Sequence, residues 1–171
     1  MTDPLAGERR LRLASHGREP AGTSLVVGHS LHPASDAALL VAVDLALRLR
    51  ADLHVVHGVD LFDYPVDPDA ADWEQQARRT LDAQHRRVAE ALAESSLGWT
   101  YQAGHGDPSR LIAAVADETD ALMIIVGSHG GGPGATFDRI VAGSVSRTVL
   151  RRQQRPVLIV PAGPHPPQAT S

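Results

Sequence analysis

The sequence predicts an α/β protein in which a five-stranded parallel sheet lies between two layers of helices. Short apolar runs alternate with segments of helical periodicity between residues 24 and 161. The runs are apolar at nearly every position, as in ALMIIV over 121–126, which is typical of parallel strands buried on both faces. Because crossovers between parallel strands are right-handed, this alternation restricts the fold to a doubly wound, three-layer α/β/α sandwich.

The first half of the domain is predicted to contain two strands and two helices. The strands are the apolar runs at 24–28 (SLVVG) and 53–59 (LHVVHGV). Between them, apolar residues recur at helical spacing from Ser35 to Arg50, and Ser35 or Asp36 is the expected N-cap. Two prolines make 60–68 a loop, and a segment rich in Ala, Arg, Glu and Gln predicts a long helix over 69–97.

The second half is predicted to add three strands and two helices. The strands are expected at 99–102, 121–126 and 156–160. Asp107 followed by Pro108 indicates the start of a helix that runs to about Glu118, because an acidic cap and a proline at the first helical position favour helix initiation. A last helix is predicted over 138–153. Arg155 and the arginines before it are interpreted as complementing the dipole at the end of that helix, and Arg87 as part of a solvated face.

The composition excludes several classes of protein. A chain of 171 residues with 43% hydrophobic residues is expected to form one domain. Its net charge of −4 gives no reason to expect nucleic acid or a membrane surface as a partner. The chain has no cysteine, and all 16 basic residues are arginine. Thiolate chemistry, a Walker-type lysine loop and a Schiff-base lysine are therefore excluded.

The ends of the chain differ from the predicted domain at 24–161. Residues 1–23 are polar and are expected to form a disordered arm, and residues 162–171 contain three prolines and are expected to form a disordered tail. No apolar run reaches the length of about 18 residues that a membrane helix needs. No apolar stretch of signal-peptide length follows Arg9-Arg10, so we expect a cytoplasmic protein.

A glycine-rich loop follows the strand predicted at 121–126 and leads into the last helix. Backbone amides that glycines expose beside a helix N-terminus favour phosphate, because the helix dipole and the unpaired N–H groups both attract an anion. The residues from Gly127 to Val145 are therefore the expected anion site.

Over residues 24–161 the chain resembles the universal stress proteins. The resemblance rests on Gly127-Ser128-His129-Gly130, on Gly143-Ser144-Val145 and on the final run RPVLIVP from Arg155 to Pro161. Nucleotide-binding members of that family carry the motif G-x2-G-x9-G-[ST] and a similar last strand. The resemblance implies an adenine nucleotide alpha hydrolase-like fold and a regulatory protein of the stress response that binds ATP, with or without Mg²⁺. It also implies a homodimer formed through Pro156–Val160, and no dedicated enzyme activity beyond slow ATP hydrolysis.

The resemblance also assigns roles to individual residues. Gly127 and Gly130 correspond to the residues that approach the ribose and phosphates, and the Gly58 backbone to the position that pairs with the adenine edge. The distal phosphates correspond to the amides at 143–145. The complete set of expected nucleotide-binding residues is Ser30, Gly58, Gly127, His129, Gly130, Gly143, Ser144 and Val145.

Two departures from the family pattern keep an alternative open. Ser30 stands where nucleotide-binding members have an aspartate, and a hydroxyl offers no carboxylate to ribose hydroxyls or a metal. The interval between Gly130 and Gly143 is 12 residues rather than nine. The alternative is a universal stress protein that binds no nucleotide and acts as a protein-interaction module.

Histidines are the other unusual feature, with nine in the chain. Five fall near the strand ends that face the expected site: His29, His32, His57, His105 and His129. No H-x-x-x-H or H-E-x-x-H pair is present, so we expect no metal site. No G-x-S-x-G elbow is present either, and no catalytic residue is assigned.

Overall fold

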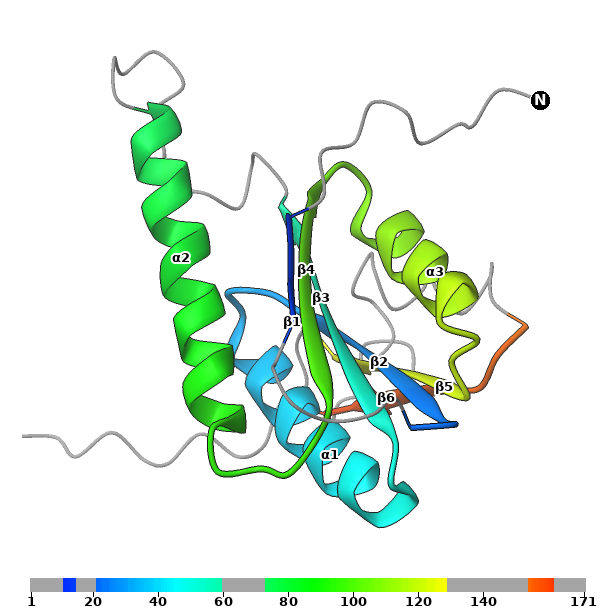
Figure 1. The fold of residues 1–171 in the computed structure, drawn as a ribbon. Helices are drawn as coiled ribbons and strands as arrows, with labels where there is room; N and C mark the ends of the chain where they lie inside the picture. Colours follow the sequence, from blue (N-terminus) through cyan, green and yellow to red (C-terminus); the bar gives the residue numbers. More distant parts are fainter. Residues whose placement is uncertain (1–10, 15–20, 60–72, 129–153, 162–171) are drawn as a thin grey trace, which may run out of the picture.

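The structure is a computed structural model that describes residues 11–14, 21–59, 73–128 and 154–161. It confirms the doubly wound α/β fold (Figure 1). In sequence order, the strands are β1 (Leu11–Ala14), β2 (Ser24–His29), β3 (Asp52–Val59), β4 (Trp99–His105), β5 (Met123–Gly127) and β6 (Val157–Val160). The helices are α1 (Pro33–Leu49), α2 (Trp73–Leu92) and α3 (Pro108–Glu118). The helix predicted over 138–153 lies outside the described residues.

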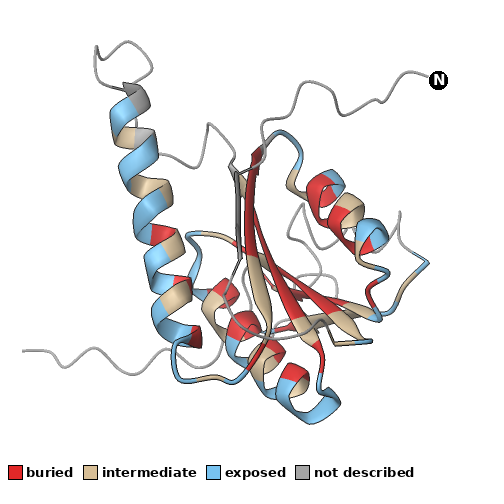
Figure 2. Ribbon diagram, viewed as in Figure 1, coloured by how far each residue is buried: buried red, intermediate tan, exposed pale blue. Residues whose placement is uncertain are grey.

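The strands form one sheet in the order β1-β4-β3-β2-β5-β6. The five strands from β2 to β6 are parallel, as the sequence predicts. Helices α1 and α2 cover one face of this sheet and α3 covers the other (Figure 1). Figure 2 shows that the buried residues are concentrated in the central strands and on the helix surfaces that face them.

Each face of the sheet has its own apolar core. On one face, Ala38, Ala42 and Ala46 of α1 pack with Val88 and Leu92 of α2 against the strands. On the other, a second cluster joins α3 to β2, β3 and β5: Leu111, Ile112, Val115 and Ala116 with Val26, Val56, Ile124 and Val126. Because a strand sends alternate side chains to opposite faces, the neighbours Val26 and Val27 belong to different cores.

The start of α1 differs from the sequence prediction. The helix begins at Pro33, and His32 is the N-cap, with its Nδ1 atom accepting a hydrogen bond from the Ala34 N–H at 3.2 Å. The predicted cap Ser35 instead directs its hydroxyl at the carbonyl oxygens of Ser30 and His32, both 2.7 Å away. The prediction of Ser35 or Asp36 is therefore wrong, because these side chains have partners beyond the helix end and an imidazole nitrogen takes the capping position.

The prediction of a disordered arm is wrong for residues 11–14. These residues form β1, which pairs antiparallel with β4, so that Leu11 lies opposite Ala103 and Ala14 opposite Thr100. The sequence LRLA is too short for its alternation to indicate a strand. The edge of β4 supplies the N–H and C=O groups with which β1 pairs. That edge exists only in the folded sheet, so the sequence does not reveal it.

Arg155 makes contacts that the sequence does not indicate, and the helix whose dipole it is predicted to complement lies outside the described residues. Its Nε–H donates to the carbonyl oxygen of Ala121 at 2.9 Å, and its guanidinium forms ion pairs with Asp117 and Asp120. Arg155 therefore fastens the segment before β6 to the end of α3 and the turn that leads into β5.

The N-cap of α3 provides a test of the local structure. The Asp107 carboxylate accepts hydrogen bonds from the Ser109 N–H at 2.9 Å and from the Ser109 hydroxyl at 2.5 Å, which confirms the predicted cap. We expect Asp107→Ala to lower the free energy of unfolding in urea by about 1 kcal/mol, since an alanine leaves the first-turn N–H unsatisfied. Asp107→Asn is the matched control and should retain most of the stability. Equal losses in the two variants would contradict a capping role.

Candidate functional site

The order in which the chain adds strands to the sheet reverses between β2 and β5. From β2 the chain proceeds to β3 and β4 on one side, and β5 then pairs with β2 on the other side. In open α/β sheets, ligands bind beyond the carboxyl ends of the strands at such a switch point. Here that position lies between the ends of β2 at His29 and of β5 at Gly127.

Gly127 is required by a close approach of two backbones. A Cβ atom at this position would lie 3.0 Å from the Ser35 nitrogen and closer still to the carbonyl group of Ala34. These atoms belong to the first turn of α1, which β5 therefore meets at its carboxyl end. The Ser128 N–H then donates to the carbonyl oxygen of Val160 at 2.8 Å, which holds Ser128 beside the end of β6.

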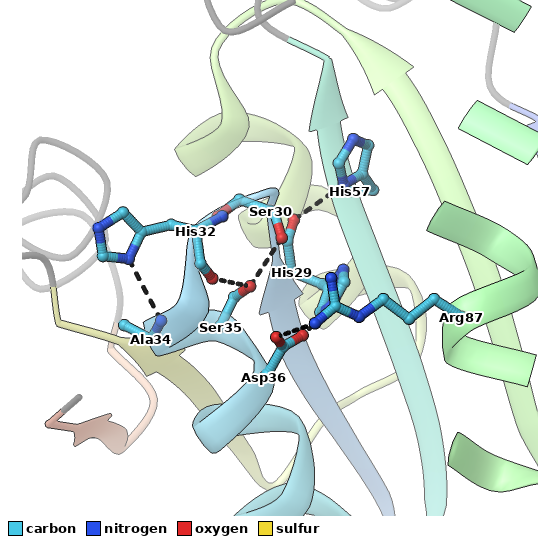
Figure 3. Close-up of polar contacts among 8 residues, drawn as sticks. All are labelled: His29, Ser30, His32, Ala34, Ser35, Asp36, His57 and Arg87. Atoms are coloured by element: carbon cyan, nitrogen blue, oxygen red, sulfur yellow. Dashed lines mark hydrogen bonds and ion pairs between the residues drawn. The ribbon is translucent and has the colours of Figure 1, made fainter. Parts of the chain in front are cut away.

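Ser30 lies directly after β2 and belongs to the turn that precedes α1 (Figure 3). Its Oγ atom accepts a hydrogen bond from the His32 N–H at 3.2 Å. Its carbonyl oxygen is 2.7 Å from the Ser35 hydroxyl. A hydroxyl that accepts one hydrogen bond can still donate its proton, so Ser30 keeps the ability to contact a ligand at the switch point.

Gly58 is explained by its contact with α3. A Cβ atom at Gly58 would lie 2.5 Å from the Pro108 Cβ and 2.9 Å from its Cα. The first residue of α3 therefore sits directly over this glycine, and a branched side chain at position 58 would displace the helix. Sequence reasoning identified Gly58 as a site residue but did not identify its contact with Pro108, because the two residues are adjacent only in the folded protein.

At Gly58, the end of β3 extends past the last residue of β2 that pairs with it. The pairing of β2 with β3 ends at His29 opposite His57, whereas β3 continues to Val59 along β4. Successive residues of a strand direct their N–H and C=O groups to opposite sides. The Asp52 N–H donates to Thr23 on the β2 side and the Leu53 N–H donates to Gly98 on the β4 side, so Gly58 directs its backbone groups toward β2 and Val59 toward β4.

A chain of polar contacts fixes the end of β2 (Figure 3). The His57 Nδ1–H donates to the carbonyl oxygen of His29 at 3.1 Å. The His29 Nε2 atom lies 3.3 Å from Asp36 Oδ1, and Asp36 Oδ2 is 2.5 Å from the Arg87 guanidinium. These contacts connect β3, β2, α1 and α2. Arg87 is exposed as the sequence predicts, but its pairing with Asp36, 51 residues away, has no local signal in the sequence.

Both histidines in this chain of contacts are buried and uncharged at neutral pH. Burial lowers the pKa of His57 to about 4, and the neighbouring His29 lowers it further when charged. Burial also lowers the pKa of His29, although the hydrogen bond that its ring donates to Asp36 opposes the change. Because a carbonyl and a carboxylate only accept, the neutral rings carry their protons on His57 Nδ1 and His29 Nε2.

The remaining predicted site residues lie outside the described residues: His129, Gly130, Gly143, Ser144 and Val145. Within the part of the chain that the structure describes, no three His, Asp or Glu side chains are grouped as they would be around a metal ion. None of the helices in those ranges has the length and hydropathy needed to span a bilayer.

The fold is a doubly wound α/β sheet whose strand order reverses between β2 and β5. Residues 23–161 match the model of the universal stress protein family, and the chain belongs to that family. This finding confirms the resemblance that the sequence motifs indicate.

Solved structures of universal stress proteins share the fold. A family member from Burkholderia pseudomallei is 25% identical, with a TM-score of 0.58 over 84% of this chain and 100% of that one. A universal stress protein in complex with cAMP is 22% identical, with a TM-score of 0.57 over 82% of this chain and 98% of the other. The Archaeoglobus fulgidus protein in complex with dAMP is 21% identical, with a TM-score of 0.54 over 81% and 97%.

The close approach at Gly127 predicts a specific loss of stability. We expect Gly127→Ala to lower the free energy of unfolding by about 1–3 kcal/mol, because the new methyl group meets backbone atoms that cannot rotate away. Gly22→Ala is the matched control, since nothing described lies within 4 Å of a Cβ atom there. Urea denaturation of both variants measures the difference, and equal stabilities would contradict the close approach.

The buried His57 predicts a pH dependence of stability. Its pKa is about 4 in the folded chain and about 6.5 when unfolded, so the unfolded state binds more protons between these values. Stability should therefore fall as the pH decreases from about 6.5 toward 4, with a slope from this group of up to about 1.4 kcal/mol per pH unit. We expect His57→Gln to reduce that slope in urea denaturation at pH 7, 6 and 5. An imidazole NMR signal of His57 that titrates near 6.5 would contradict the prediction.

Proposed function

We propose that this chain binds an adenine nucleotide at the switch point of its sheet and acts as a dimeric regulatory module of the stress response. The observation that carries the proposal is the arrangement of backbone at this point. The Gly127 end of β5 meets the first turn of α1, and the end of β3 extends past the last residue of β2 that pairs with it. The two family members solved in complex with cAMP and dAMP support an adenine nucleotide as the ligand class.

The adenine would lie against the end of β3. Its edge carries a hydrogen-bond donor and acceptors, which complement the N–H and C=O groups of one extended residue. Such a contact depends on the backbone alone, so the glycine at position 58 does not weaken it. Ser30, which directly follows the neighbouring strand β2, is the proposed contact to the ribose.

The phosphates would be bound by the glycine-rich loop beyond β5. The amides at Gly143, Ser144 and Val145 are the proposed contacts to the distal phosphates, with Gly130 and His129 nearer the ribose, and Mg²⁺ would accompany ATP. The proposed second copy pairs through β6, which is the last strand of the sheet and whose apolar residues Val157, Leu158 and Ile159 are only half-buried. We propose a cytoplasmic location and no catalytic role.

Titration calorimetry with ATP and Mg²⁺, AMP and cAMP tests the proposal. We expect binding in the micromolar range, and we expect Gly143→Val to abolish it because a side chain would block the approach of phosphate to the backbone amides. Gly22→Val is the matched control and should bind normally. The absence of heat at high micromolar nucleotide, together with partners recovered by pull-down with or without ATP, would instead support the interaction module.

The serine at position 30 provides a gain-of-binding test. We expect Ser30→Asp to tighten ATP binding by about tenfold, since a charge-assisted hydrogen bond from a ribose hydroxyl is about 1.4 kcal/mol stronger than a neutral one. The same variant should bind 2′,3′-dideoxy-ATP no more tightly than the native chain does. An equal gain for both nucleotides, or no gain for either, would place Ser30 away from the ribose.

A further inference from the structure

The two edges of the sheet are protected in different ways against pairing with strands of other chains. One edge is β6, a strand of four residues that lies between Pro156 and Pro161. The other edge of the parallel sheet is β4, which is covered by β1. The match to the family model starts at residue 23, so β1 lies outside the family domain and is an addition that this chain carries.

Without β1, β4 would be an unprotected edge strand. Its seven residues, WTYQAGH, include no Asp, Glu, Arg, Lys or Pro. Natural edge strands usually avoid pairing with other chains through charged residues, prolines, bulges or short length. The sequence of β4 has instead the aromatic and β-branched residues that favour sheet formation. β1, in contrast, places Arg12 in the edge strand.

The orientation of β1 indicates which partner it excludes. When two copies of one strand pair across a two-fold axis, the two strands are antiparallel. β1 pairs antiparallel with β4, from Leu11 opposite Ala103 to Ala14 opposite Thr100, although all the other pairings in the sheet are parallel. It therefore occupies the position that the β4 strand of a second copy would take.

We propose that β1 is an intramolecular cap that prevents β4 from pairing with β4 of a second copy. When β1 is absent, the two copies join their sheets through this edge. If β6 also pairs with β6, as the proposed function holds, a chain with both edges free would form an open-ended row, because each molecule has two self-complementary edges. The cap at β4 would then limit assembly to a closed dimer. The pairing through β4 itself does not depend on the proposed function.

Two truncated chains test this proposal. Deletion of residues 1–20 removes β1, and deletion of residues 1–9 retains it as the matched control. By light scattering at equal concentrations, we expect the mass of the shorter chain to be at least twice that of the control and to rise with concentration. Equal masses for two chains that both unfold cooperatively would overturn the proposal. Nucleotide is omitted, so a failure of nucleotide binding does not affect the result.

A peptide separates specific pairing from general aggregation. A synthetic peptide of residues 8–16 should return the shorter chain to the mass of the control, whereas a peptide of the same residues in scrambled order should not. Reversal by both peptides, or by neither, would overturn pairing through β4. If the shorter chain does not fold, Leu13→Pro in the full chain replaces it, because proline removes a backbone donor from β1. A folded Leu13→Pro variant with the mass of the native chain would also overturn the proposal.

Discussion

The close approach of β5 to the first turn of α1 is the constraint on which the rest of the candidate site depends. Gly127 has no side chain, and for that reason the carboxyl end of β5 contacts the backbone of Ala34 and Ser35 directly. This contact brings the reversal of strand order, the start of a helix and the end of β2 into one small region. A second glycine contact, Gly58 beneath Pro108, sets the start of α3 against the end of β3 in the same way. Glycines in this protein therefore position whole elements, in addition to any contact that they make with a ligand.

Polar contacts hold the β2 end of this region in place. The carbonyl of His29 accepts a hydrogen bond from buried His57, and the ring of His29 is linked through Asp36 to Arg87. Both imidazoles are neutral because burial disfavours their charged forms. Ser30 follows this anchored strand end immediately. The backbone that carries the Ser30 hydroxyl is thus anchored to β3, α1 and α2, and the proposed ribose contact would differ from that of an aspartate in its charge.

The two edges of the sheet also differ from each other. A short apolar strand between two prolines forms one edge, and an added antiparallel strand covers the other. Edge strands determine how sheet proteins associate, because their unpaired backbone groups accept another strand readily. In this protein a strand from outside the residues that match the family covers one edge, two strands away from the switch point between β2 and β5. The candidate site and the proposed control of assembly therefore belong to separate parts of the sequence.

Local patterns in the sequence were sufficient to predict the five parallel strands, the three described helices and the Asp107 cap. Each depends on residues close together in the chain, namely apolar runs, helical periodicity or a cap followed by proline. The positions of Ser30, Gly58 and Gly127 at strand ends also followed from sequence, because strand ends in this fold converge on the switch point. The tertiary structure alone decided the His32 cap, the pairing of β1 with β4, the contact of Gly58 with Pro108 and the link from Asp36 to Arg87. The last three of these contacts join residues far apart in sequence. His32 takes the capping position at α1 while the Ser35 hydroxyl is bound to the carbonyl oxygens of Ser30 and His32. A close approach or a shared hydrogen bond exists only when the sheet has brought its members together.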